Sequence, residues 1–271
     1  MGFFHMNYFS PVLGFGTDIE VFVPTPNSDE ILNHKDSGYF YDGVRFPVLY
    51  VLHGAFGDCT DWSRLTGIER YAQERKVVLV MASADNSFYQ DMYRGSRYFT
   101  YISDEVPAYI ERFFPVSKLR EETFIAGLSM GGYGALHIAL ARPDKYSAAI
   151  SLSGAVDIAG EIQRHASYSP FCWNNIFRDP EHVEGTDADI FYQLKRLLEK
   201  RSRIPRLFQS CGTEDFLYEM NRSAYRRICD MGVQITFDEA PGQHDWNYWD
   251  AGIVRAFDWL FEPAKDTQAG I

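Results

Sequence analysis

A serine flanked by glycines is the strongest chemical signal in the chain. The segment Gly-Leu-Ser-Met-Gly spans residues 127–131, after the apolar stretch Thr123–Ala126 and before a stretch with helical character. Such a strand, tight turn and helix would expose the hydroxyl of Ser129. The serine backbone is strained in this turn, and a Cβ at either flanking glycine would clash with neighbouring elements. The context predicts that Ser129 is a nucleophile, and that the N–H of Met130 at the helix N-terminus stabilises an oxyanion.

A histidine that can accept the serine proton is expected late in the chain, because the base comes last in this type of strand and helix arrangement. His244 lies in Pro-Gly-Gln-His-Asp-Trp, just beyond the apolar stretch Ile235–Glu239. A loop there would lie at the same sheet edge as Ser129. His53 precedes the serine and lies within a glycine-containing loop, so we expect it to orient that loop. His244 is therefore the predicted general base.

A carboxylate between the serine and the histidine would hold the imidazole in the correct tautomer and stabilise the imidazolium. Asp215, in Cys-Gly-Thr-Glu-Asp-Phe, follows the apolar stretch Arg206–Ser210 and is the first choice. The adjacent Glu214 would point elsewhere. Asp157 follows the preceding predicted strand and is the rival candidate.

A second oxyanion donor is expected from the segment Leu-His-Gly-Ala-Phe-Gly at residues 52–57. A glycine-containing loop after a core strand can turn a backbone N–H towards the nucleophile. The N–H of Ala55 is the first choice, and that of Phe56 is the alternative.

Short apolar runs alternate with longer amphipathic stretches, which indicates βαβ units and a mostly parallel sheet covered by helices. We expect core strands at Phe46–Leu52, Val77–Ala82, Thr123–Ala126, Ala148–Leu152, Arg206–Ser210 and Ile235–Glu239. Before them, Phe9–Leu13 and Asp18–Pro24 are predicted to form an antiparallel pair at the sheet edge. The predicted fold class is α/β, in one domain that spans residues 1–271.

The stretch between the fourth and fifth core strands, residues 155–204, is longer than a usual crossover connection. We interpret it as a cap over the carboxyl ends of the strands, where open α/β sheets bind ligands. Its aromatic residues Phe171, Trp173 and Phe177 would then restrict the acyl pocket to small or flat groups. The predicted substrate-binding residues are Phe56, Trp173 and Trp246.

Composition excludes several classes of function. A formal net charge of -11 argues against nucleic acid as a partner, because binding it requires Lys and Arg to neutralise phosphates. The first residues lack a secretory signal and no apolar run is long enough to cross a bilayer, so we expect a cytoplasmic protein without a membrane partner. The four cysteines lack CxxC spacing, and we expect free thiols and no metal site.

With these residues assembled, the chain resembles the esterase D and tributyrin esterase family of α/β-hydrolases, whose relatives include feruloyl esterases and S-formylglutathione hydrolases. The matching segments run through nearly the whole chain: residues 52–58 with 61–62, 127–136, 210–217 and 244–249, together with Ile-Phe-Arg-Asp-Pro-Glu at 176–181.

The resemblance implies the α/β-hydrolase fold, the triad Ser129, Asp215 and His244, and the oxyanion donors Met130 and Ala55. It implies a serine carboxylesterase that acts on a small-molecule short-chain or aryl ester through an acyl-enzyme, without a cofactor. We also allow for self-association into a homo-oligomer. One alternative is S-formylglutathione hydrolysis. A Cys-Thr pair at residues 59–60 is similar to that branch, although two extra residues precede it and the histidine segment differs. Acyl transfer to an alcohol by the same triad is the other alternative.

Overall fold

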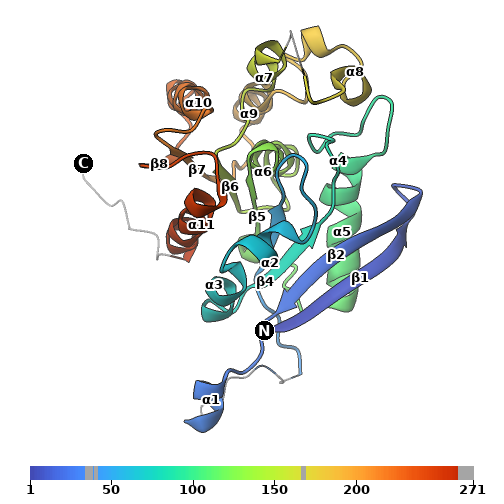
Figure 1. The fold of residues 1–271 in the computed structure, drawn as a ribbon, viewed down its shortest axis with the longest axis vertical. Coiled ribbons are helices and arrows are strands. Elements are labelled where there is room, and N and C mark those ends of the chain that lie inside the picture. Colours follow the sequence, from blue (N-terminus) through green and yellow to red (C-terminus); the bar gives the residue numbers. More distant parts are fainter. Residues whose placement is uncertain (34–38, 40–41, 166–168, 262–271) are drawn as a thin grey trace.

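The computed structural model describes residues 1–33, 39, 42–165 and 169–261. An eight-stranded sheet runs through the molecule in the order β1-β2-β4-β3-β5-β6-β7-β8 (Figure 1). The β1–β2 and β2–β4 pairs are antiparallel and the remaining pairs are parallel. The strands are β1 (Gly2–Ser10), β2 (Phe15–Val23), β3 (Val48–Leu52), β4 (Val78–Ala82), β5 (Thr123–Leu128), β6 (Ala148–Leu152), β7 (Arg206–Gly212) and β8 (Thr236–Ala240).

All six predicted core strands are present within two residues of their expected ends, which confirms the mostly parallel α/β sheet. The prediction for the antiparallel pair was wrong in position. Its first strand is Gly2–Ser10 rather than Phe9–Leu13, because the chain turns back between Ser10 and Phe15. Gly14 has φ 83° and donates its N–H to the carbonyl of Ser10 at 2.8 Å. Most of β1 is exposed at the sheet edge, and Phe3 and Phe9 lie on the face opposite the half-buried Met6 and Tyr8, so its apolar residues are not confined to one face.

Helices cover both faces of the sheet. The helical elements are α1 (Ser28–Leu32), α2 (Asp61–Leu65), α3 (Ile68–Glu74), α4 (Tyr98–Thr100), the π-helix η1 (Tyr101–Glu105), α5 (Val106–Phe113), η2 (Arg120–Glu122), α6 (Met130–Ala141), α7 (Ile158–Arg164), α8 (Trp173–Ile176), η3 (Pro180–His182), α9 (Ile190–Glu199), α10 (Tyr218–Asp230) and α11 (Trp246–Phe261). Apolar residues of α5, α6 and α10 pack in one core, and those of α3 and α11 pack in the core on the opposite face.

The helix α6 is buried along almost its whole length. Every residue from Met130 to Leu140 is buried, because the sheet covers one side of α6 and α9 covers another. A helix that is apolar all round belongs in a protein interior rather than on its surface. The turn between β5 and α6, which holds Ser129, is therefore fixed at both ends by packed elements.

The long connection between β6 and β7 contains α7, α8, η3 and α9. Figure 1 shows α7 and α8 at the top of the molecule, above the strands, while α9 lies near α6. The two parts of this connection thus have different neighbours.

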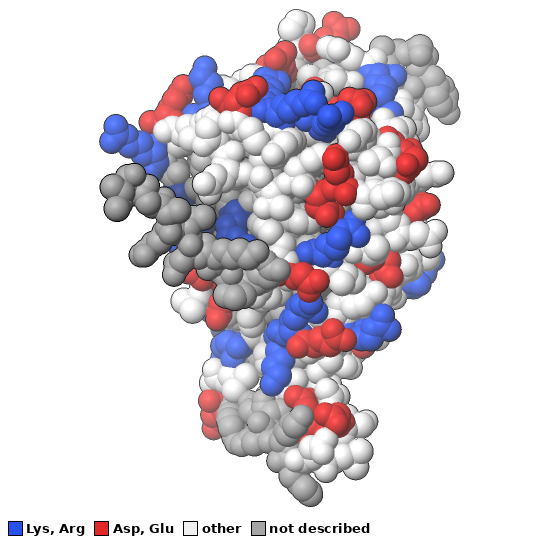
Figure 2. All heavy atoms as spheres, turned by 90° about the vertical axis from the view of Figure 1, so that its left-hand side faces the viewer, with Lys and Arg blue, Asp and Glu red and all other residues white. Residues whose placement is uncertain are grey.

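Acidic and basic side chains are interspersed on the side of the molecule next to α10 and β8 (Figure 2). An interspersed surface creates no extended field of one sign. The described side chains visible on this face therefore form no continuous positive stripe of the kind that would follow a nucleic-acid backbone.

Candidate active site

Ser129 occupies a strained turn between β5 and α6. Its backbone φ is 54°, a value that residues other than glycine adopt rarely. A Cβ built on Gly127 would lie 2.2 Å from the carbonyl oxygen of Gly131, and one built on Gly131 would lie 2.5 Å from the carbonyl oxygen of His53. The N–H of Ser129 donates to the carbonyl of Leu152 at 2.9 Å, which ties the turn to β6. Both glycines are therefore required by close backbone packing.

Three loops at the carboxyl edge of the sheet bring Ser129, His244 and Asp215 together. The Oγ atom of Ser129 lies 2.9 Å from Nε2 of His244, and Nδ1 of His244 lies 2.9 Å and 3.0 Å from the two carboxylate oxygens of Asp215. Because a carboxylate only accepts hydrogen bonds, a neutral His244 carries its proton on Nδ1 and leaves Nε2 free to accept from the serine hydroxyl.

Asp215 is positioned to remain ionised. Its side chain is buried, and it also accepts the N–H of Leu217 at 2.8 Å. Burial alone would raise the pKa of Asp215, but the hydrogen bond and charge of His244 and the Leu217 N–H together hold the pKa below its usual value. A carboxylate in this state can stabilise an imidazolium.

The other acidic candidates have separate structural tasks. Asp157 caps the N-terminus of α7 and accepts the N–H of Gly160 at 3.0 Å. Glu214 points away from His244 and accepts the N–H of Gly242 at 2.5 Å. The structure thus places neither of them on the histidine.

Two backbone donors near Ser129 have no acceptor among the described residues, namely the N–H groups of Met130 and Ala55. The N–H of Phe56, the alternative donor, is instead bonded to Oδ1 of Asn86 at 2.7 Å. Gly54 allows this loop to lie close to the serine, because a Cβ there would be 2.6 Å from the Leu128 side chain. The free donors are suitable for an oxyanion beside Ser129.

His53 is buried in the structure and fixes the loop, as its place in the sequence suggested. Its Nε2 accepts the N–H of Ala84 at 2.8 Å, so Nδ1 carries the proton and donates to the carbonyl of Gly54 at 2.6 Å. Burial lowers the pKa of His53, which keeps the ring neutral. Both ring nitrogens are therefore occupied, and His53 has no free nitrogen for proton transfer.

A cavity of about 620 Å³ opens beside Ser129 and His244. Phe56 and Trp246 line it, as predicted, and Phe56 is 70% exposed and stacks on Phe171 with ring centroids 5.5 Å apart. Trp173 does not line this cavity. It is 8% exposed and packs behind Phe171, at 5.1 Å between ring centroids. Phe171 is therefore the residue of this pair that lines the cavity, and Trp173 packs against Phe171 from behind.

Three polar side chains of the cavity wall were missed in the sequence. Glu161 is buried, and it accepts hydrogen bonds from Arg164 at 3.2 Å and lies 3.1 Å from Nε2 of His165. The Arg164 guanidinium lies 4.7 Å above the ring of Phe216, which in turn contacts His244 with ring centroids 4.4 Å apart. The sequence signal for these residues was their spacing i, i+3, i+4 on a short helix, which places them on one face. The same spacing is also typical of surface ion pairs, so it does not by itself indicate a cavity wall.

No group of three His, Cys, Asp or Glu residues in the described part of the chain is arranged to hold a metal ion. Within the same ranges, no helix combines the length and the apolar character that crossing a bilayer requires.

Comparisons with known proteins identify the family of this chain. A family model named Esterase, with the description "Putative esterase", matches residues 30–260. An acetyl esterase of Caldicellulosiruptor saccharolyticus is 32% identical over 266 residues, which cover 96% of this chain and 98% of that protein.

Two solved structures from Staphylococcus aureus are also similar. The fluorophosphonate-binding serine hydrolase FphF has 34% identity and a TM-score of 0.85, with 96% of this chain and 98% of that chain covered. The S-formylglutathione hydrolase FrmB also has 34% identity over the same shares, with a TM-score of 0.82.

The fold and the family match define a serine hydrolase of the α/β-hydrolase class. The chain belongs to the Esterase family, and it is a serine carboxylesterase that acts on small ester substrates.

Proposed function

We propose that Ser129, His244 and Asp215 are the catalytic triad of this carboxylesterase, and that the N–H groups of Met130 and Ala55 form its oxyanion hole. The observation that carries this proposal is the continuous hydrogen-bond chain from Ser129 Oγ through the imidazole to the buried carboxylate. The two unoccupied N–H groups beside the serine support it.

The reaction has two acyl-transfer steps. His244 takes the Ser129 proton as Oγ attacks the ester carbonyl, and the two N–H groups stabilise the tetrahedral oxyanion. The imidazolium, stabilised by Asp215, then gives its proton to the departing alcohol as the ester C–O bond breaks. A water attacks the acyl-enzyme in the same way, with His244 accepting its proton and returning it to Oγ. The products are a carboxylic acid and an alcohol.

The preferred substrates are esters of acetate and other short acyl groups. Phe171 and Phe88 are aromatic residues of the cavity wall beside Ser129, and the relative from Caldicellulosiruptor saccharolyticus is named an acetyl esterase. Glu161 and Arg164 offer an acceptor and a donor to a polar leaving group. The alternative substrate is S-formylglutathione, favoured by the 34% identity to FrmB.

We also propose that the chain forms one domain, with residues 155–204 as a cap. A single sheet that includes strands from Gly2 to Ala240 supports one domain, and the cavity contacts of Glu161 and Phe171 support the cap. All four cysteines are free, which favours a reducing compartment such as the cytoplasm. Self-association stays a prediction, for which the exposed phenylalanines of the edge strand β1 are the best surface.

A fluorophosphonate probe and a series of p-nitrophenyl esters test the triad and the acyl preference together. We expect the probe to label Ser129, and Ser129→Ala to lose both labelling and turnover while it keeps the wild-type melting temperature. Ser223→Ala, a change at an exposed serine on α10, is the matched control and should alter neither. Labelling of Ser129→Ala at the wild-type rate would refute the assignment. Turnover of S-formylglutathione far above that of p-nitrophenyl acetate would establish the alternative substrate.

A further inference from the structure

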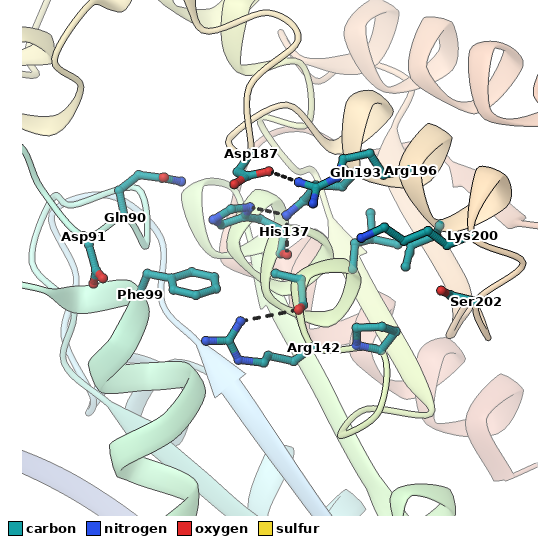
Figure 3. Close-up of a pocket in the computed structure, with 14 residues that line it drawn as sticks. Gln90, Asp91, Phe99, His137, Arg142, Asp187, Gln193, Arg196, Lys200 and Ser202 are labelled. Atoms are coloured by element: carbon teal, nitrogen blue, oxygen red, sulfur yellow. Dashed lines mark hydrogen bonds and ion pairs between the residues drawn. The ribbon is translucent and has the colours of Figure 1, made fainter.

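A second cavity, also of about 620 Å³, lies between the C-terminal half of α6, α9 and the loop before α4 (Figure 3). It shares no lining residue with the cavity beside Ser129. The proposed esterase mechanism uses none of its side chains. Its volume is within the range of cavities that bind small molecules.

The floor of this cavity contains a buried histidine with an unused donor. His137 is 4% exposed, and the amide nitrogen of Gln193 donates to its Nδ1 at 3.1 Å and to its carbonyl at 3.3 Å. Because Nδ1 accepts, the ring proton is on Nε2, and no described residue accepts a hydrogen bond from it. Burial lowers the pKa of His137 to about 4, so the ring is neutral near pH 7 and keeps this N–H. This N–H is thus accessible from the cavity and has no acceptor in the described part of the chain, so it is suited to a ligand acceptor.

The cations around this cavity are not equivalent. Arg142 is bonded to Asp104 at 2.8 Å, and Arg196 is bonded to Asp187 at 2.5 Å. Lys200 lines the same cavity but has no ion pair within the described ranges. Figure 3 shows the Lys200 side chain on the side of the cavity opposite Gln90. One positive charge is thus available to a ligand.

The remaining wall is mixed: Gln90, Asp91, Asp187 and Ser202 are polar, with Asp91 near Arg97 and Asp187 paired with Arg196, and the other part is apolar and partly aromatic. Phe99, Leu140, Pro143 and Leu197 line the cavity together with the ring of His137, whose centroid is 5.0 Å from that of Phe99. A flat apolar group can pack against these side chains, whereas a bare inorganic anion would leave them exposed to water. The wall therefore favours an organic ligand over a simple ion.

We propose that this cavity is a second ligand site, which binds a small carboxylate with a flat apolar body. Lys200 pairs with the carboxylate group, and the Nε2–H of His137 donates a hydrogen bond to a ligand oxygen. Phe99 and Leu197 pack against the body of the ligand. The Nε2–H of the neutral imidazole orients the ligand through a hydrogen bond, and the charge of the lysine makes the site selective for an anion.

Calorimetric titration with 2-naphthoate, and with 2-naphthamide as its uncharged counterpart, tests this site. We expect 2-naphthoate to bind at submillimolar concentration. Lys200→Gln should weaken that binding about tenfold, because it removes a charge-assisted contact. Lys195→Gln is the matched control, because Lys195 is exposed on the same helix outside the cavity, and it should leave the affinity unchanged.

A second variant tests the location of the ligand. Ala141 lines the cavity at the end of α6 and is only partly buried, so Ala141→Trp should fill the space and abolish binding while ester hydrolysis continues. Equal affinity for naphthoate and naphthamide would overturn the proposal. Binding that Ala141→Trp leaves intact would also overturn it, because the ligand would then occupy another place such as the Ser129 cavity. Absence of binding at millimolar naphthoate would overturn it as well.

Discussion

Replacing Asp215 with asparagine should remove most of the activity by changing which nitrogen of His244 carries the proton. In the structure, Oδ1 of Asp215 accepts the Leu217 N–H at 2.8 Å, while Oδ2 lies 2.9 Å from Nδ1 of His244. An asparagine that keeps its oxygen towards Leu217 must direct its NH₂ group at Nδ1. Nδ1 then becomes an acceptor, and the ring proton moves to Nε2. A protonated Nε2 can no longer accept the proton of Ser129.

The expected loss in kcat/KM for p-nitrophenyl acetate is about 10⁴-fold, by analogy with a protease triad that carries the same change. This loss corresponds to about 5 kcal/mol of transition-state stabilisation. Asp157→Asn is the control, because asparagine caps a helix as well as aspartate does, and its activity should stay close to that of the wild type. The nitrogen NMR spectrum of His244 should show the tautomer change directly. An Asp215→Asn enzyme with more than a tenth of the wild-type kcat/KM would refute this reasoning.

Three further perturbations follow from the geometry. Phe171→Ala should shift the acyl-length optimum of p-nitrophenyl ester hydrolysis towards longer chains, with about 1 kcal/mol of transition-state stabilisation for each added methylene that fits. Trp173→Ala should chiefly lower the melting temperature. Equal acyl-length profiles for Phe171→Ala and the wild type would contradict this prediction. Gly127→Ala should destabilise the fold by about 3 kcal/mol in urea unfolding, because its Cβ would lie 2.2 Å from a backbone oxygen, and a wild-type urea midpoint would show that the turn can relax. The native state has a His137 pKa of about 4, whereas the unfolded state binds a proton at this histidine below about pH 6.5. The free energy of unfolding therefore does not depend on His137 above pH 6.5 and decreases by about 3 kcal/mol between pH 6.5 and pH 4. His137→Phe should remove that part of the pH dependence in urea titrations, and His182→Phe, at an exposed site, should not.

The close approach of Ser129, Asp215 and His244 could be predicted because each follows a strand that the sequence marks clearly. Parallel strands place their carboxyl ends at one edge, so the loops at Ser129, Asp215 and His244 had to meet there once the strands were recognised. The choice between Ala55 and Phe56 needed coordinates, because it depends on the Asn86 side chain that occupies the Phe56 N–H, thirty residues further along the chain.

The aromatic residues of the long connection illustrate a different limit. Phe171 and Trp173 are two residues apart and equally apolar, yet one faces the cavity and the other packs behind it. Which of them is outermost depends on the path of the chain around α8, and that path has no periodicity that a sequence could reveal. The position of β1 was missed for a related reason, since Met6 and Tyr8 of this edge strand are only half-buried while Phe3 and Phe9 on its other face are exposed, so its apolar residues are not confined to one face.

The strands from β5 to β8 are neighbours in the sheet in the same order in which they occur in the chain. During synthesis the sheet can therefore grow outward from the nucleophile, one strand at a time, as the ribosome releases each segment. Ser129, the proposed nucleophile, is synthesised early, whereas its proposed base His244 follows only with the loop after β8. A nascent or truncated chain that ends before this loop would display the serine without the means to activate it. With the proposed triad, the order of the strands delays the appearance of esterase activity until the loop after β8 has been made.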